Sequence, residues 1–404
     1  MKKLGLGFEK FSAQQSKFLI ALLALGLSAC NQGGSNYPLQ DPTGQGGGDG
    51  NTVCPNEVIK GRYIVQWTDG TYTVEHANDE EQFKRKFIDP QLSKIKHIDR
   101  DIKIQVNPMI TSDDDLNTLA TSNWGPAKIQ ADQLWSQGYK GNGVTVGVVD
   151  GMVDKAHVQL KNNVASTVQF NSESNNFSKN IHGTHVAGII AADPDLGPIQ
   201  GVAPKAKIVG GQFIGNNGGG AIGDAILALN SVASRGAKII NMSWGGAPCM
   251  QNLKDTLQSL SDQGIILVTA AGNEGTNSDN APTYPAAYGF TRQINVAATD
   301  SFDWMAAFSV RGYRTVNLAA PGVGIVSSIP NNQYQSMDGT SMAAPMVSGA
   351  AALLWGAVPS ATADQIKSSL LKGIDLSPGS EYQVSSRGRL NVKKALDELL
   401  KLPH

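Results

Sequence analysis

Ser341 lies in a stretch whose residue types suit a nucleophile. Residues 339–345 (GTSMAAP) form a sharp turn followed by small and apolar residues that are typical of a helix. Backbone N–H groups point outward at a helix start, and the helix dipole favours negative charge there. The place therefore suits a serine whose attack creates an oxyanion. On these residues alone, a Ser or Thr before a helix is more often only a cap.

Two further stretches supply the groups that such a serine needs. Residues 144–150 (VTVGVVD) predict a buried parallel strand with Asp150 at its carboxyl end, and residues 182–188 (HGTHVAG) open a small-residue helix with His182. A serine hydroxyl needs an adjacent base, and histidine has an unperturbed pKa near neutrality. A carboxylate would hold the imidazole tautomer and stabilise the imidazolium. Asp150, His182 and Ser341 are therefore the predicted catalytic residues.

The three motifs, in this order, resemble those of the subtilisin-like serine proteases. The resemblance covers roughly residues 120–400. It implies a serine endopeptidase that cleaves extended protein substrates through an acyl-enzyme intermediate. The family usually follows the aspartate with Ser or Thr and then Gly, whereas this chain has Gly151 and Met152. The missing hydroxyl leaves an alternative open, a catalytically impaired surface lipoprotein that binds peptides through the same cleft.

The resemblance also implies an oxyanion site and a substrate cleft. Asn273 matches the family's oxyanion asparagine, which would donate its side-chain amide beside the backbone N–H of Ser341. Glycines that flank a substrate let its backbone approach closely and pair as an added strand. The residues implied for substrate binding are Gly219, Gly220, Ser243, Trp244, Gly245, Ala270, Gly272 and Thr283.

Metal ions enter the prediction in two ways. His182 and His185 are three residues apart and could both bind a metal, but no HExxH motif or cysteine cluster supplies a zinc site. Two buried structural histidines are the other alternative. The chemistry itself requires no cofactor. Residues 193–199 have the length and place of the family's calcium loop, with Asp195 as a candidate ligand, but Gln159 stands where an Asp ligand is usual.

The composition favours a large α/β domain with a smaller unit before it. The chain has 404 residues, of which 41% are hydrophobic and 17% charged, and 45 are Gly. A net charge of −1 gives no support to a nucleic-acid partner or a polybasic membrane patch. Strands are expected over residues 143–150, 206–214, 238–244 and 265–271, and helices over 221–235, 251–263, 362–372 and 390–401. This alternation predicts a doubly wound, mostly parallel sheet with helices on both faces.

The first 55 residues have the composition of a targeting segment and a tether. Residues 1–29 combine lysines with a short apolar run, and residues 27–30 (LSAC) resemble a bacterial lipobox. The resemblance implies cleavage before Cys30 and a lipid anchor on its thiol; an ordinary signal peptide is the alternative. Residues 30–55 are a Gly-rich flexible tether. We expect an exported protein anchored to a bacterial membrane, the outer one in a Gram-negative host.

A charged unit separates this tether from the peptidase-like domain. Residues 56–110 alternate like a strand over 61–67, become amphipathic and helical over 79–97, and alternate again over 101–106. By position they resemble the family's propeptide, an inhibitor and folding aid; a permanent accessory domain is the alternative. Residues 111–123 form a linker with the expected processing region at 111–124, and residues 124–404 are the peptidase domain. Processing there would release the enzyme from its anchor.

Two cysteines remain if Cys30 carries lipid. Cys54 and Cys249 could pair in an oxidising compartment, which would staple the end of the tether to the peptidase domain. Two free thiols are the favoured expectation.

Overall fold

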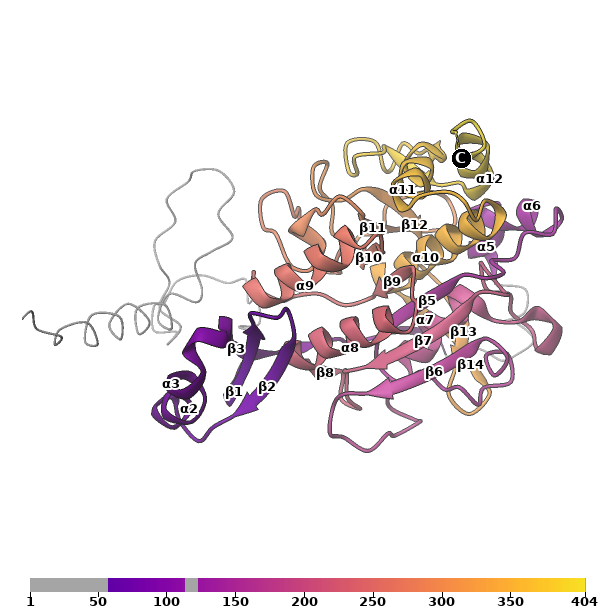
Figure 1. The fold of residues 1–404 in the computed structure, drawn as a ribbon. Coiled ribbons are helices and arrows are strands. Elements are labelled where there is room, and N and C mark those ends of the chain that lie inside the picture. Colours follow the sequence, from indigo (N-terminus) through magenta and orange to yellow (C-terminus); the bar gives the residue numbers. More distant parts are fainter. Residues whose placement is uncertain (1–56, 113–122, 404) are drawn as a thin grey trace, which may run out of the picture.

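A computed structural model describes residues 57–112 and 123–403 of the chain. The predictions for residues 1–29 and 30–55, for Cys30 and Cys54, and for most of the linker lie outside these ranges. Figure 1 shows a large unit that contains the central sheet and a smaller unit, in indigo, at its side.

A nine-stranded sheet forms the centre of the large unit, in the order β15-β16-β12-β11-β10-β9-β5-β7-β6. All neighbouring strands are parallel except β15 and β16. β5 lies between β7 and β9, so the strand order reverses beside β5, which is where crevices form in such sheets. The strands are β5 (Thr145–Asp150), β6 (Val164–Gln169), β7 (Lys207–Gln212), β9 (Ile239–Met242), β10 (Ile266–Ala270), β11 (Gln293–Thr299), β12 (Leu318–Pro321), β15 (Ile374–Leu376) and β16 (Gly388–Leu390).

Helices cover both faces of this sheet, and each face has its own hydrophobic core. Val146 and Val148 of β5 pack into one core, and Val149 packs into the other, because successive side chains of a strand point to opposite faces. The first core contains α7 (His182–Ala191), α10 (Thr340–Ala357), α11 (Ala363–Lys372) and α12 (Val392–Leu399); the second contains α8 (Ile222–Ser234) and α9 (Gln251–Asp262). The predicted α/β fold is confirmed.

Helix α10 is almost wholly buried. Every residue from Thr340 through Trp355 is buried, and the helix packs against β9, β10, β11 and β12. A helix that is apolar or small on all sides belongs inside a protein. Its first turn, which carries Ser341, is therefore fixed by its surroundings.

The smaller unit is an antiparallel sheet with a helical segment on one face. β1 (Glu57–Trp67) lies between β2 (Tyr72–His76) and β3 (Ile95–Gln105). The helical segment runs through α2 (Glu80–Phe83), a π turn (Lys84–Ile88) and α3 (Asp89–Gln91). The predicted helix over 79–97 is too long. Residues from Ile95 onward belong to β3, because they pair antiparallel with β1, from Trp67 opposite Ile95 onward.

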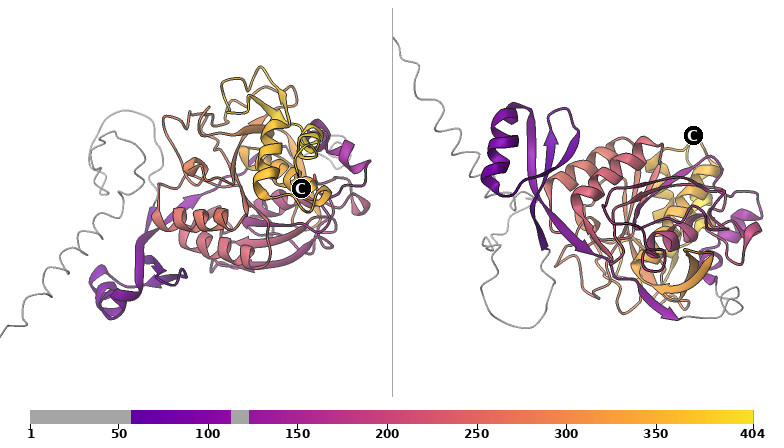
Figure 2. Two further views of the ribbon diagram at one scale, coloured as in Figure 1. Left: turned by 45° about the horizontal axis from the view of Figure 1, so that its top comes forward. Right: turned by 90° about the horizontal axis from the view of Figure 1, so that it is seen from below.

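The small unit docks on α8 and α9, as both views of Figure 2 show. Asp101 Oδ1 accepts a hydrogen bond from Gly223 N at 2.9 Å, and Asp99 Oδ2 accepts one from Asn252 N at 2.9 Å. Each carboxylate thus satisfies a backbone N–H in the first turn of one helix, where the dipole favours negative charge. Arg62 forms ion pairs with Asp101, at 2.7 Å, and with Asp224 of α8.

Two strand pairings extend this contact across the large unit. β3 pairs antiparallel with β8 (Gly219–Ala221), and β4 (Met109–Ser112) pairs antiparallel with β14 (Gln333–Asp338), which also pairs with β13 (Ile325–Ile329). β4 crosses the predicted boundary between residues 110 and 111. The start of the expected linker is therefore an ordered part of the large unit's edge.

Cys249 is disulfide-bonded. The two other cysteines of the chain, Cys30 and Cys54, both precede residue 57. The expectation of a free thiol is therefore wrong for Cys249, whereas Cys30 and Cys54 lie outside the described residues. Within residues 57–112 and 123–403, no helix has the length and hydropathy needed to cross a membrane.

The buried contact around Asp101 predicts a pH dependence of docking. Burial raises the pKa of Asp101 from 3.8 to about 6, although the Gly223 N–H and the Arg62 guanidinium lower it. Burial also raises the pKa of Asp224, against the lowering effects of Arg62 and, more weakly, of His76. The docked state holds the Asp101 proton more tightly than the undocked state. Docking is therefore strongest below pH 4. As the pH rises through 6, the equilibrium constant for docking falls by up to about a hundredfold.

The test compares melting temperatures from pH 4 to 7 for Ser341→Ala and Ser341→Ala/Asp101→Asn, both lacking the predicted nucleophile. Asn cannot titrate, so the chain that retains Asp101 should lose stability relative to the Asp101→Asn chain as the pH rises. Parallel melting curves would contradict the role of Asp101.

Candidate active site

Asp150 and His182 meet at the carboxyl edge of the sheet. Asp150 ends β5 and is fully buried, and His182 begins α7. Asp150 Oδ1 accepts hydrogen bonds from His182 Nδ1 at 2.8 Å and from Gly151 N at 2.5 Å. With its proton on Nδ1, the imidazole presents Nε2 as a base.

Ser341 is held by reciprocal hydrogen bonds with Ser243, the residue that follows β9. Ser341 Oγ donates to the Ser243 carbonyl at 3.0 Å, and Ser243 Oγ donates to the Ser341 carbonyl at 2.8 Å. Asn241 Nδ2 in turn donates to Ser243 Oγ at 2.9 Å. No hydrogen bond joins Ser341 Oγ to His182 among the described residues, so the hydroxyl must turn toward the imidazole before it can react.

Asn273 lies beside the same helix start. Its Oδ1 accepts hydrogen bonds from Thr340 N and Thr340 Oγ1, both at 2.9 Å. Both bonds use the oxygen, so the Nδ2 group remains as a donor; it lies 3.4 Å from the place of a Cβ on Gly339. Thr340 Oγ1 also accepts from Gly272 N at 3.1 Å. Sequence reasoning missed Thr340 and Asn241, although both stand inside or beside recognised motifs.

The departure at Gly151 has a structural counterpart. Asp150 Oδ2 is buried and has no hydrogen-bond partner among the described residues. A Cβ on Gly151 would lie 2.3 Å from Asn180 Oδ1. Asn180 is fixed there because its Oδ1 accepts from Met152 N at 2.9 Å and its Nδ2 donates to the Ile214 carbonyl at 3.0 Å. Asn180 therefore occupies the space that a hydroxyl-bearing residue 151 would need.

His185 has its hydrogen-bond partner in β14, not in the Asp150–His182 pair. It is fully buried, its Nε2 lies 2.9 Å from the Gln335 carbonyl, and burial lowers its pKa to about 3. It is therefore a neutral residue that contacts the backbone of β14. Within the described parts of the chain, no group of three His, Cys, Asp or Glu residues could hold a metal ion.

The residues implied for substrate binding differ in how open they are to a substrate. Gly219 and Gly220 form β8, whose free edge is covered by β3. The Trp244 side chain is buried, donating from Nε1 to the Val149 carbonyl at 2.9 Å, so only its backbone could meet a substrate. A Cβ on Gly245 would meet nothing closer than the Tyr284 carbonyl at 3.8 Å. Ala270 ends β10, with Gly272 two residues later, and Thr283 is half-buried.

The geometry of residues 193–199 does not fit a calcium site. Gln159 Nε2 donates to the Asp193 carbonyl at 2.8 Å and to the Ile199 carbonyl at 2.7 Å, so an amide nitrogen occupies the centre of the loop. Lys205 Nζ pairs with Asp193 Oδ2 at 3.0 Å and with Asp195 at 3.7 Å. A calcium ion would need these oxygens as ligands. The Gln159 amide and the Lys205 ammonium already supply the positive partners.

Chelation should therefore leave the fold unchanged. We expect EDTA and added calcium to give the same melting temperature, because Gln159 holds the loop. Gln159→Ala should destabilise the chain by about 1–3 kcal/mol, since two buried carbonyls lose their donor. Thermal unfolding of both proteins with EDTA and with calcium measures this; a chelator-sensitive melting temperature in the unmodified chain would restore the calcium site.

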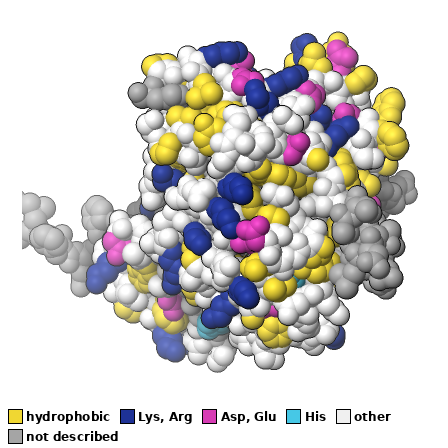
Figure 3. Space-filling model, turned by 90° about the vertical axis from the view of Figure 1, so that its right-hand side faces the viewer, with side chains coloured by type: hydrophobic (Ala, Val, Ile, Leu, Met, Phe, Trp, Pro, Cys, Tyr) yellow, Lys and Arg dark blue, Asp and Glu magenta, His cyan; other side chains and the backbone are white. Residues whose placement is uncertain are grey.

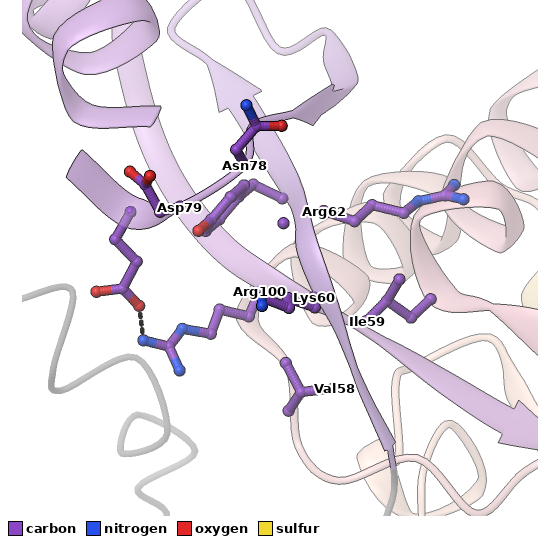
Figure 4. A pocket seen from close by; sticks show the side chains of 10 residues that line it. Val58, Ile59, Lys60, Arg62, Asn78, Asp79 and Arg100 are labelled. Carbon is purple, nitrogen blue, oxygen red and sulfur yellow. Dashed lines mark ion pairs between the residues drawn. The ribbon is translucent and has the colours of Figure 1, made fainter. Parts of the chain in front are cut away.

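The small unit has a surface hollow that none of the predicted catalytic residues lines. A hollow of about 590 Å³ in the small unit is lined by residues of β1, β3 and the segment before α2, including Lys60, Asp79 and Arg100. Figure 4 shows Arg100 paired with Glu80 there, and Arg62 extending away toward α8. On the face seen in Figure 3, basic and acidic side chains are interspersed.

Comparison with known proteins agrees with this geometry. Residues 141–390 match the model of the subtilase family. Subtilisin DY from Bacillus licheniformis is 37% identical over 277 residues, which cover 68% of this chain and 98% of the relative. Thermitase from Thermoactinomyces vulgaris is 36% identical over 280 residues, covering 69% and 97%. The major intracellular serine protease of Bacillus subtilis is 36% identical over 266 residues, covering 62% and 80%. The chain therefore belongs to the subtilase family and is a serine endopeptidase.

Proposed function

We propose that this peptidase cleaves extended protein substrates through Asp150, His182 and Ser341, with an acyl-enzyme intermediate. The observation that carries the proposal is the 2.8 Å hydrogen bond between Asp150 Oδ1 and His182 Nδ1. It fixes the imidazole so that Nε2 is the free base, on the same side of the sheet as the helix start that presents Ser341.

The reaction follows from these positions. As Ser341 Oγ bonds to the substrate carbonyl carbon, His182 Nε2 takes the hydroxyl proton. The oxyanion accepts hydrogen bonds from Asn273 Nδ2 and from the backbone N–H of Ser341. His182 then gives the proton to the leaving amine, and a water molecule repeats the two steps on the ester. Asp150 stays ionised throughout and stabilises the imidazolium.

The cleft is suited to an extended chain. β8 accepts a strand along its edge, with Gly219 and Gly220 allowing close approach, and the surface around Gly245 is open. We assign the walls of the pocket for the residue before the scissile bond to Gly245, Ala270 and Gly272, with Thr283 at its floor.

The catalytic assignment can be tested by the rate of labelling with a fluorophosphonate probe. Wild type should label and Ser341→Ala should not. Asn273→Ala should label about 100- to 1,000-fold more slowly, the loss known for the equivalent asparagine of subtilisin. Thr340→Ser keeps the hydroxyl that bonds Asn273 and serves as the matched control, with a rate near wild type.

If wild type fails to label, brief treatment with an external protease separates two causes. Labelling that then appears identifies an enzyme closed by its small unit. Labelling that never appears removes the catalytic assignment and favours the peptide-binding lipoprotein.

We further propose that the small unit is a propeptide and that Cys30 carries the lipid anchor. Lipidation of Cys30 leaves Cys54 as the partner of Cys249. The disulfide changes the expectation for processing, because a cut within residues 111–124 no longer separates the peptidase from its tether.

Membrane partitioning tests this arrangement. After such a cut, the active species should stay in the membrane fraction and move to the soluble fraction only when a reductant is added. Cys30→Ser should be soluble in both conditions. Active enzyme released without a reductant would contradict the proposal.

A further inference from the structure

The small unit continues into the cleft along the path of a substrate. β3 runs antiparallel to β8, with Ile104 opposite Gly220 and Gln105 opposite Gly219. The ladder closes with a hydrogen bond from Val106 N to the Gly218 carbonyl at 2.8 Å. The chain is thus added as an extra strand to the segment implied for substrate binding.

The same chain then pairs with the strand that leads to the nucleophile. Met109 lies opposite Asp338 in β14, three residues before Ser341. Only Asn107 and Pro108 separate the two ladders, and the three steps from Val106 to Met109 reach at most about 11 Å. The right-hand view of Figure 2 shows the purple chain passing from the small unit along the large one.

Burial shows how closely this segment fits. Ile104 and Val106 are buried in one cluster with Phe213 and Ile222, whereas Asn107 is exposed. A Cβ on Gly218 would lie 2.0 Å from the Val106 carbonyl oxygen, so this approach requires glycine. The chain before Asn107 and Pro108 is therefore closely packed against the large unit, while Asn107 itself is exposed.

We propose that the Asn107–Pro108 peptide bond is the one presented to Ser341, and that Pro108 protects it from cleavage. The inference rests on the proposed function of Ser341. The small unit is then an inhibitor. The enzyme does not remove it by cutting the Asn107–Pro108 bond. Opening the cleft requires a cut at another bond, made by a second peptidase molecule.

The chemistry of proline supplies the protection. Cleavage would form an ester between Ser341 Oγ and the Asn107 carbonyl carbon and break the bond to the Pro108 nitrogen, which would take the proton from His182. The proline ring holds φ near −65°, whereas an extended strand needs about −120° or beyond, and its nitrogen has no N–H to pair. Pro108, on the leaving-group side of the bond, therefore departs from the extended conformation that the chain adopts again in β4.

The test compares Pro108→Ala with wild type by intact mass after reduction. Pro108→Ala should cut itself between residues 107 and 108, giving a chain that begins at residue 108. Wild type and Pro282→Ala, a matched change at an exposed proline, should show no such product. Neither should Pro108→Ala combined with Ser341→Ala. Pro108→Ser is a second variant that should behave as Pro108→Ala does.

Two results would overturn the inference. One is cutting of wild type at residues 107–108 as fast as the variants. The other is the absence of this cut in both Pro108 variants, provided that they label with the fluorophosphonate probe after brief external proteolysis. If neither variant nor wild type ever labels, the proposed catalytic function fails, and this inference, which rests on it, fails with it.

Discussion

The position of Ser341 depends on the hydrogen bonds around the first turn of α10. Two groups flank this turn: Ser243, just after β9, bonds Ser341 in both directions, and Asn273, after β10, bonds Thr340. The rest of α10 is buried against four strands, so the helix cannot shift to relieve these contacts. A preorganised donor array of this kind stabilises charge without reorganisation during the reaction. The turn is thus held by segments that follow two neighbouring strands of the sheet.

The small unit occupies the strand edges that we propose for substrate binding. It is fixed by carboxylates at two helix starts and by strand pairing with β8 and with β14, the strand that precedes Ser341. Main-chain pairing gives affinity with little dependence on side chains, whereas the buried aspartates and Arg62 set the register. The unit is therefore held at several points at once, and β3 and β4 lie along β8 and β14.

Much of this arrangement could be predicted from the sequence. Asp150, His182, Ser341 and Asn273 stand in motifs whose local pattern also defines strand ends and helix starts, so chemistry and fold were predicted together. The end of the helix before β3 was misjudged, because an amphipathic helix and a half-buried strand share residues such as Ile95 at their junction. The roles of Thr340, Asn241 and Asn180 depend on distances between segments far apart in the chain. No local pattern carries that information. The disulfide of Cys249 could likewise not be predicted, since the spacing of cysteines alone does not determine their pairing.

The Gln159 amide has a consequence for the range of media in which the fold persists. Stabilisation by a bound ion follows mass action, so it declines as the free ion concentration falls toward the dissociation constant. A side chain of the same polypeptide is present at fixed stoichiometry and cannot be diluted. The loop of residues 193–199 therefore keeps its shape independently of the ion content of the medium.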